Sequence, residues 1–418
     1  MGRSNRTIWK CGILFLFFVL VLSGCQQKHG DTEHSGTVSG KPASTQSAEE
    51  KEHKEQYTPI PTQEVKEGKD GFGEIKGKIT EVFYGNDGNL LMQTEKNIWL
   101  YHVADQTVKA KMKVPDLRNL SVRRLDGGYA MVGEISRSEK KGAGMSADSG
   151  SIDGDWRVLL LDSSLNIRKK INVSKLMGGK SNISDAECIA ISRDEGKIAV
   201  ATKKGIFLWD AQSEKRQKIL DFAKKQVIEH LVLDGVNQIA FMKDDKKLAF
   251  FSSVLPESAS DGEESISAWG TVSLDGKGLK MSADADYHGE EMQVYDDCLV
   301  LSESFEHNSG RLLKVDTGSG KKSFIPFSDK REGKDGVYSS ADGTYFATAC
   351  LAGNSVTVRI YDMEQGRVLL KKTIKNKKEE YFYRIPRIYL LDKEETCVVV
   401  LGAGIEEVET KVEQFVWR

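Results

Sequence analysis

From about residue 72 onward, apolar residues occur in short, strand-like runs that are separated by turns rich in Asp and Gly. One turn recurs between two such runs, for example as Asn86-Asp87-Gly88 and as Ala341-Asp342-Gly343. Asp-Gly between two β-rich runs is a strong hairpin signal, because the tight turn needs positive φ. The first aspartates of these turns recur about every 51 residues, at Asp87, Asp126, Asp194, Asp244, Asp296, Asp342 and Asp392.

A second turn follows in six of these units, after an apolar run that ends in aspartate. The aspartates of this second turn are Asp105, Asp162, Asp210, Asp275, Asp316 and Asp362. Each unit therefore contains four short strands, which is the pattern of a propeller blade. One such sheet cannot bury both faces, whereas a ring of sheets buries each face against a neighbour. We predict an all-β fold over 72–418, a seven-bladed β-propeller of four-stranded antiparallel blades. The alternatives are six or eight blades, a β-sandwich or two stacked β-domains.

Two of the repeated units carry a further resemblance. Trp209-Asp210 and Tyr361-Asp362 resemble the ending of WD-type (WD40) repeats, and Ser192-Arg193-Asp194 stands where those repeats carry a Ser-x-Asp turn. The Gly-His pair that opens a true WD repeat is missing from every unit. The chain is therefore similar to WD-like propellers, in particular to the broad class of bacterial extracytoplasmic propellers.

The two ends of the repeat region predict how the ring closes. After Asp392 the chain supplies three strands and then ends at Arg418. The segment Phe72 to Ile79 has strand-like composition and precedes the first complete unit. If it pairs with the last blade, no sheet edge is left open, so we expect this segment to complete that blade.

The N-terminus has the layout of a secretory signal. A basic start precedes an unbroken apolar run of ten residues, from Ile13 to Leu22, which is too short to span a bilayer. The run ends in Leu22-Ser23-Gly24-Cys25, which resembles the lipobox of bacterial lipoproteins. This resemblance implies a signal peptide at 1–24, a lipid on Cys25 and a location on the extracytoplasmic face of the cell membrane. The alternative is an ordinary signal peptide with a chance cysteine.

Residues 25–71 are polar and charged, without helical or strand periodicity. Such a segment buries too little apolar surface to offset the entropy of ordering. We therefore expect a disordered linker that carries the propeller, which we expect to be a monomer. Across the chain 60 basic residues balance 62 acidic ones, for a net charge of −2. This balance argues against nucleic acid as a partner.

The second and fourth units are longer than the others between their second and third strands. The extra residues lie at about 136–155 and 256–267, and long loops on a rigid scaffold often bind partners. The alternative is a tolerated insertion, because longer loops cost little entropy. The tryptophans of these units are candidate aromatic contacts for a partner, and the alternative is that they pack between blades. The candidate binding residues are Lys140, Lys141, Asp148, Asp153, Asp155, Trp156, Glu257, Asp261, Glu263, Glu264 and Trp269.

We expect the protein to act by binding or as a scaffold. The expected partner is an envelope protein or peptide, with a cell-wall glycan second. The alternative is a propeller enzyme, lactonase-like or lyase-like, whose site would lie in the central channel between the innermost strands. Those strands contain few histidines and little repeated acid, so we assign no catalytic residue, metal or cofactor. The remaining cysteines, Cys188, Cys298, Cys350 and Cys397, are expected to be buried thiols, although disulfides between blades stay open as an alternative.

Overall fold

The computed structural model describes residues 69–70, 72–135, 155–179, 183–224, 226–228, 231–233, 235–254, 266–284, 287, 289–303, 312–325, 336–382, 384–403, 405, 408 and 410–417. By its internal contacts the chain divides into Met1–Thr58 and Pro59–Arg418, and only the second unit contains described residues. The signal-like segment and nearly all of the linker lie outside them and stay predictions. Within the described residues, no helix has the length and apolar character needed to cross a bilayer.

Seven four-stranded sheets make up the folded unit, and we number them as blades in chain order. Blade 1 is formed by β2 (Ile79–Tyr84), β3 (Asn89–Thr94), β4 (Asn97–His102) and β5 (Thr107–Lys113). Blade 2 is formed by β6 (Leu117–Leu125), β7 (Gly128–Ile135), β8 (Trp156–Asp162) and β9 (Ile167–Asn172). Blade 3 is formed by β10 (Ile189–Ile191), β11 (Lys197–Thr202), β12 (Gly205–Asp210) and β13 (Lys215–Asp221). Blade 4 is formed by β16 (Gln238–Phe241), β17 (Lys247–Val254), β18 (Ile266–Ser273) and β19 (Lys280–Asp284). Blade 5 is formed by β20 (Gly289–Val294), β21 (Cys298–Glu303), β22 (Leu312–Asp316) and β23 (Lys322–Ile325). Blade 6 is formed by β24 (Gly336–Ser339), β25 (Tyr345–Ala352), β26 (Ser355–Asp362) and β27 (Val368–Lys375). Blade 7 is formed by β28 (Arg387–Leu391), β29 (Thr396–Leu401), β30 (Lys411–Val416) and β1 (Lys69–Asp70).

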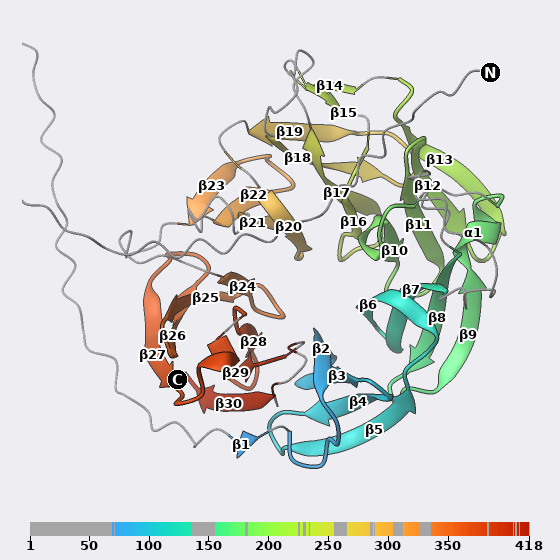
Figure 1. Cartoon of the computed structure of the whole chain (residues 1–418). Helices are drawn as coiled ribbons and strands as arrows, with labels where there is room; N and C mark the ends of the chain where they lie inside the picture. Colours follow the sequence, from blue (N-terminus) through green and yellow to red (C-terminus); the bar gives the residue numbers. More distant parts are fainter. Residues whose placement is uncertain are drawn as a thin grey trace, which may run out of the picture. The chain divides into compact units, whose positions relative to one another are not determined.

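Every neighbouring pair of strands within a blade is antiparallel. The seven sheets stand in a ring, with the first strand of each blade toward the centre and the fourth on the perimeter (Figure 1). The predicted all-β, seven-bladed propeller is therefore confirmed. The predicted innermost segments correspond to β2, β6, β10, β16, β20, β24 and β28.

Ring closure follows the expected topology but uses a different segment. β1 pairs with β30, with Lys69 opposite Val412 and Asp70 opposite Lys411. Residues 72–78, which were expected to be this strand, form turns and bends instead. Gly73 and Gly77 have φ of 59° and 100°, which is incompatible with extended backbone. The apolar residues of the segment are still buried, since Phe72 and Ile75 belong to the cluster between blades 7 and 1.

The repeated aspartates shape the turns, as the sequence indicates. At the first turn of blade 1, Asp87 and Gly88 both have positive φ, 50° and 71°. At the second turns the carboxylate accepts hydrogen bonds from the backbone that follows. Asp162 accepts from Asn166 N at 2.8 Å, and Asp210 accepts from Ser213 N at 2.7 Å. The side-chain amide of Asn166, together with its backbone N–H, holds the pKa of Asp162 below the usual range, and the backbone N–H of Ser213 does the same for Asp210.

Apolar packing between blades holds the ring together. One buried cluster spans blades 2, 3 and 4, and the others join blades 1 and 2, 4 and 5, 5 and 6, 6 and 7, and 7 and 1. Every junction of the ring therefore has its own apolar contact. The smaller elements are a hairpin of β14 (Gln226–Ile228) and β15 (Leu231–Leu233), helix α1 (Val173–Leu176), and two 3₁₀ segments, η1 (Ala186–Cys188) and η3 (Glu379–Phe382).

The antiparallel order gives the ring two different faces. The first turns of all seven blades and the second turns of blades 1 to 6 lie on one face, which we call the turn face. The connections between second and third strands, and those between blades, lie on the other, which we call the loop face. Both predicted insertions belong to the loop face, because they connect β7 to β8 and β17 to β18.

Candidate functional site

The innermost strands enclose a channel of about 910 Å³. Its wall combines polar and apolar side chains, and four of its charged groups pair across blade junctions. Arg387 of blade 7 contacts Glu81 of blade 1 with both guanidinium nitrogens, and Nη2 lies 3.1 Å from Oε1. Arg123 of blade 2 contacts Glu187, which precedes β10 of blade 3, at 2.7 Å. These pairs neutralise most of the charge that the strands present to the channel.

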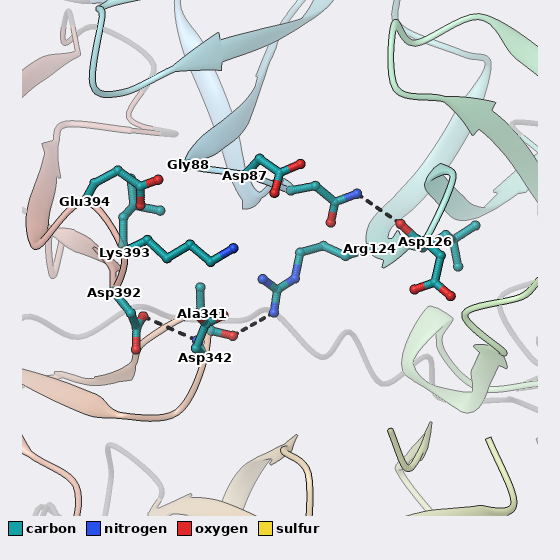
Figure 2. A pocket seen from close by; sticks show the side chains of 13 residues that line it. Asp87, Gly88, Arg124, Asp126, Ala341, Asp342, Asp392, Lys393 and Glu394 are labelled. Atoms are coloured by element: carbon teal, nitrogen blue, oxygen red, sulfur yellow. Dashed lines mark hydrogen bonds between the residues drawn. The ribbon is translucent and has the colours of Figure 1, made fainter. Parts of the chain in front are cut away.

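Toward the turn face, side chains that line the channel form hydrogen bonds to other blades. The Tyr84 hydroxyl of blade 1 donates to Ser339 O of blade 6 at 3.0 Å and accepts from Leu390 N of blade 7. The Arg124 guanidinium of blade 2 donates to Ala341 O, beside blade 6, at 2.7 Å (Figure 2). Burial raises the pKa of Tyr84 well above its usual range, so this hydroxyl stays protonated as a donor. Arg124 thus spans from blade 2 to blade 6 at the turn-face end of the channel.

At this end lies a smaller hollow of about 270 Å³, formed by the first turns of blades 1, 2, 6 and 7. Carboxylates outnumber cations here, with five acids against Arg124 and Lys393 (Figure 2). The acidic residues that line it are Asp87, Asp126, Asp342, Asp392 and Glu394.

The first turns also bond to one another around the turn face. Asn86 donates to Leu125 O, and Asp126 N donates to Arg193 O. Further along, Arg193 N donates to Asp245, and Lys243 pairs with Asp296. These bonds join blades 1 to 5 in order.

Two more junctions are closed by hydrogen bonds, and the third by a close approach of two turns. The Tyr295 hydroxyl donates to Ser340 O at 3.0 Å, and Ser340 Oγ donates to Asp392 at 2.7 Å. Between blades 7 and 1, Glu394 lies so close to Gly88 that a Cβ there would be 2.3 Å from Oε1. The turn face is thus largely used for contacts between blades.

Asp392 carries the carboxylate that joins blades 6 and 7. It accepts from Ser340 Oγ and from the backbone N–H groups of Asp342 and Thr344. Burial raises its pKa above the usual value, and the hydrogen bond from Ser340 offsets part of this rise.

We expect Asp392→Asn to remove a pH-dependent part of the stability. Because the pKa is higher in the folded than in the unfolded state, the folded chain binds more protons just above the unfolded pKa of about 4. The contribution of Asp392 is therefore full at lower pH and is lost as the pH rises through the folded pKa. The free energy of unfolding, measured with urea from pH 4 to 7, should decline less steeply with pH for the variant than for the unchanged protein. The control is Asp275→Asn, an exposed second-turn residue, and an unchanged slope for Asp392→Asn would contradict the assignment.

Few of the candidate binding residues fall within the described part of the chain. Asp155, Trp156 and Trp269 are described. The others, Lys140, Lys141, Asp148, Asp153, Glu257, Asp261, Glu263 and Glu264, lie outside it, as does Cys25. Asp155 is half-buried at the base of the first insertion, where it pairs with Arg157 at 2.7 Å. Trp156 and Trp269 are buried, at 0% and 1% exposure. In this structure both indoles pack within the blade clusters, the second of the two interpretations considered for them.

The channel residues were not singled out from the sequence. The repeat predicted which strands are innermost, but Tyr84, Arg124 and Tyr295 acquire their partners only when the ring closes. In the described residues no three His, Cys, Asp or Glu side chains are grouped to hold a metal ion. His102, the one described histidine, lies on β4 beside Asp105 rather than in the channel. Among the described residues, Cys188, Cys298, Cys350 and Cys397 form no disulfide, and Cys350 is half-buried rather than buried as expected.

No protein-family model matches the chain, and no curated protein matches it significantly. Among solved structures, the β-propeller domain of Cps50 (Swd1) from Myceliophteria thermophila aligns with a TM-score of 0.50 and 11% identity, covering 85% of this chain and 99% of that one. Hsv2 of Kluyveromyces lactis aligns with a TM-score of 0.45 and 11% identity, over 78% and 91%. An acylaminoacyl peptidase of Pyrococcus horikoshii aligns with a TM-score of 0.42 and 14% identity, over 68% of this chain and 42% of that one. At 11% identity the first likeness shows the β-propeller fold alone.

Proposed function

We propose that this chain is a lipid-anchored extracytoplasmic protein that binds an envelope protein or peptide on the loop face of its propeller, with a cell-wall glycan as the second candidate ligand. One observation carries the proposal. The two long insertions begin and end on the loop face, whereas the turn face is occupied by bonds between blades. Polar loops held on a rigid ring have the arrangement expected of a binding surface.

The bases of both insertions support this assignment. At the first, Ile135 N donates to Asp155 O at 3.0 Å, and Trp156 N donates to Ser174 Oγ of α1 at 3.1 Å. At the second, the ladder between β17 and β18 extends to the pair Val254 and Ile266. Each loop therefore rises from a fixed base, which reduces the ordering entropy that binding must overcome.

The alternative is catalysis in the central channel, and the observation that favours it is the 910 Å³ cavity with Glu81, Glu187 and Glu291 on its wall. Two of these carboxylates are paired with arginine. A general acid or base would have to leave such a pair, which favours the binding function.

The binding proposal is tested by crosslinking in cells with the intact chain and a variant that lacks 138–154 and 257–265. The matched control is Lys393→Ala, which changes an exposed side chain on the turn face. We expect one envelope component to be captured by the intact chain and by the control, and to be lost with the loop variant. Capture that survives loop removal would overturn the proposal. If neither chain captures a partner, glycans and small lactones should be tested against the channel.

The anchor is tested separately by metabolic labelling with an alkyne fatty acid. We expect the label on the intact chain and on Cys11→Ala, and its loss with Cys25→Ala, because the lipobox-like sequence places the modified thiol at Cys25. Label that persists on Cys25→Ala would exclude this attachment site.

A further inference from the structure

The perimeter of blades 1 to 3 carries exposed positive charge, although the net charge of the whole chain is slightly negative. Their outermost strands β5, β9 and β13 contain nine basic residues and a single acidic one, Asp221. All nine basic side chains are exposed. We call this set the basic arc: Lys109, Lys111, Lys113, Arg168, Lys169, Lys170, Lys215, Arg216 and Lys218. Because the net charge of the chain is only −2, and acids collect at the turn-face hollow, charge is segregated on this ring.

Several cations of the arc have partners within the protein. Lys109 pairs with Asp105, Arg168 with Glu195, and Lys218 with Asp221. Lys111 lies 5.2 Å from the centre of the Trp99 ring, and Arg216 lies 5.6 Å from that of Phe207. In the described structure Lys113, Lys169, Lys170 and Lys215 have neither a carboxylate nor an aromatic partner. These four side chains, spread over three neighbouring blades, are available to an external anion.

Lysine on an edge strand also prevents edge-to-edge pairing of sheets. That role accounts for lysine on single outer strands, but it does not require three neighbouring outer strands to carry nine cations against one acid. A surface with this bias is complementary to an extended anion.

The position at which the N-terminal segment joins the ring indicates which anion this is. β1 is the outermost strand of blade 7, and blade 7 is the neighbour of blade 1. The chain from Cys25 therefore meets the folded unit on the perimeter, next to β5. If the 43 residues between Cys25 and β1 are a flexible linker, they span roughly 35–40 Å. This length lets the perimeter reach the bilayer that holds the lipid.

We propose that the basic arc docks on the anionic phospholipid headgroups of the anchoring membrane, so that the ring stands on its edge. The inference rests on the proposed anchor, because the lipid on Cys25 would keep the basic arc at a high local concentration near the membrane. The electrostatic contact between the arc and the headgroups does not itself require that lipid. Edge-on docking leaves the loop face directed sideways along the membrane, accessible to a partner in the same envelope. Charge interactions are screened within about 8 Å at physiological salt, so the lysines must lie close to the headgroups.

The test uses the chain from residue 26 onward, which contains every described strand and lacks Cys25. Binding is measured by co-sedimentation with vesicles of 30% phosphatidylglycerol in phosphatidylcholine and with pure phosphatidylcholine, at low and physiological salt. We expect binding to the anionic vesicles alone, weakened by salt. The triple variant Lys169→Glu, Lys170→Glu, Lys215→Glu should bind on the order of a hundredfold more weakly, since each lysine near an anionic surface contributes about a fivefold effect.

The matched control is Lys371→Glu, Lys372→Glu, Lys375→Glu, which makes the same change of charge on β27 of blade 6. We expect it to retain binding within a few-fold. Equal loss from both variants, or no binding to anionic vesicles at low salt, would overturn the proposal, as would a preference for soluble polyphosphate over vesicles. Size-exclusion chromatography of the triple variant should show a monomer, because the glutamates still protect the edge. The proposed anchor is judged by the Cys25 labelling and the proposed binding by the loop deletion, so failure of each proposal is distinguishable.

Discussion

Replacing Phe72 by alanine should lower the free energy of unfolding by about 3–5 kcal/mol, the range for a buried phenylalanine. Phe72 is 3% exposed, and its ring centre lies 5.0 Å from that of Tyr101 in an edge-on arrangement. The same cluster contains Val412 of β30 and Tyr389 of β28. The side chain therefore packs where the first and last blades meet, and its loss weakens the closure of the ring.

Guanidinium unfolding monitored by circular dichroism measures this effect. Glu74→Ala is the control, because this exposed neighbour should change stability by no more than about 0.5 kcal/mol. A loss below 1 kcal/mol for Phe72→Ala would show that the closing segment contributes little to the fold.

Trp156→Ala should be destabilising by a similar amount, about 3–5 kcal/mol. The indole is fully buried in the cluster that spans blades 2 to 4. It stands at the first position of β8, where its backbone N–H is bonded to Ser174, so a cavity here also loosens the base of the first insertion. Trp156→Phe should recover most of the loss.

Thermal unfolding together with the crosslinking assay separates the two interpretations of this tryptophan. We expect Trp156→Phe to keep partner capture, because the ring is not exposed. A variant with normal stability and no capture would instead make Trp156 a contact residue.

The blade pattern could be predicted because turn chemistry is local. Asp162 and Asp210 accept hydrogen bonds from residues two to four positions later, so each turn carries its signal in its own sequence. The hairpin of β14 and β15 gave no such signal, since each strand is only three residues long. The closing strand was placed too late in the chain because Phe72 and Ile75 have strand-like composition, although the glycines around them hold a bent backbone.

The channel could be predicted only in outline. The repeat shows that inner strands exist, and it identifies them correctly. It carries no information on which side chains meet across the ring, because Tyr84 and Ser339 are separated by 255 residues and Arg124 and Ala341 by 217. Such pairs depend on the number of blades and on their tilt, which no local pattern encodes.

The way β1 joins blade 7 determines how the ring responds to mechanical force. Given the proposed lipid anchor, a pull on the propeller would apply tension through the N-terminal segment to β1, which is held by two residue pairs. The outermost strands of other blades are held by four to six or more. Under load β1 should detach from β30 first. The tension would then pass to Phe72 and Ile75, which follow β1 in the chain and are buried in the cluster between blades 7 and 1. The propeller would thus yield in two steps at one junction while the other six stay closed.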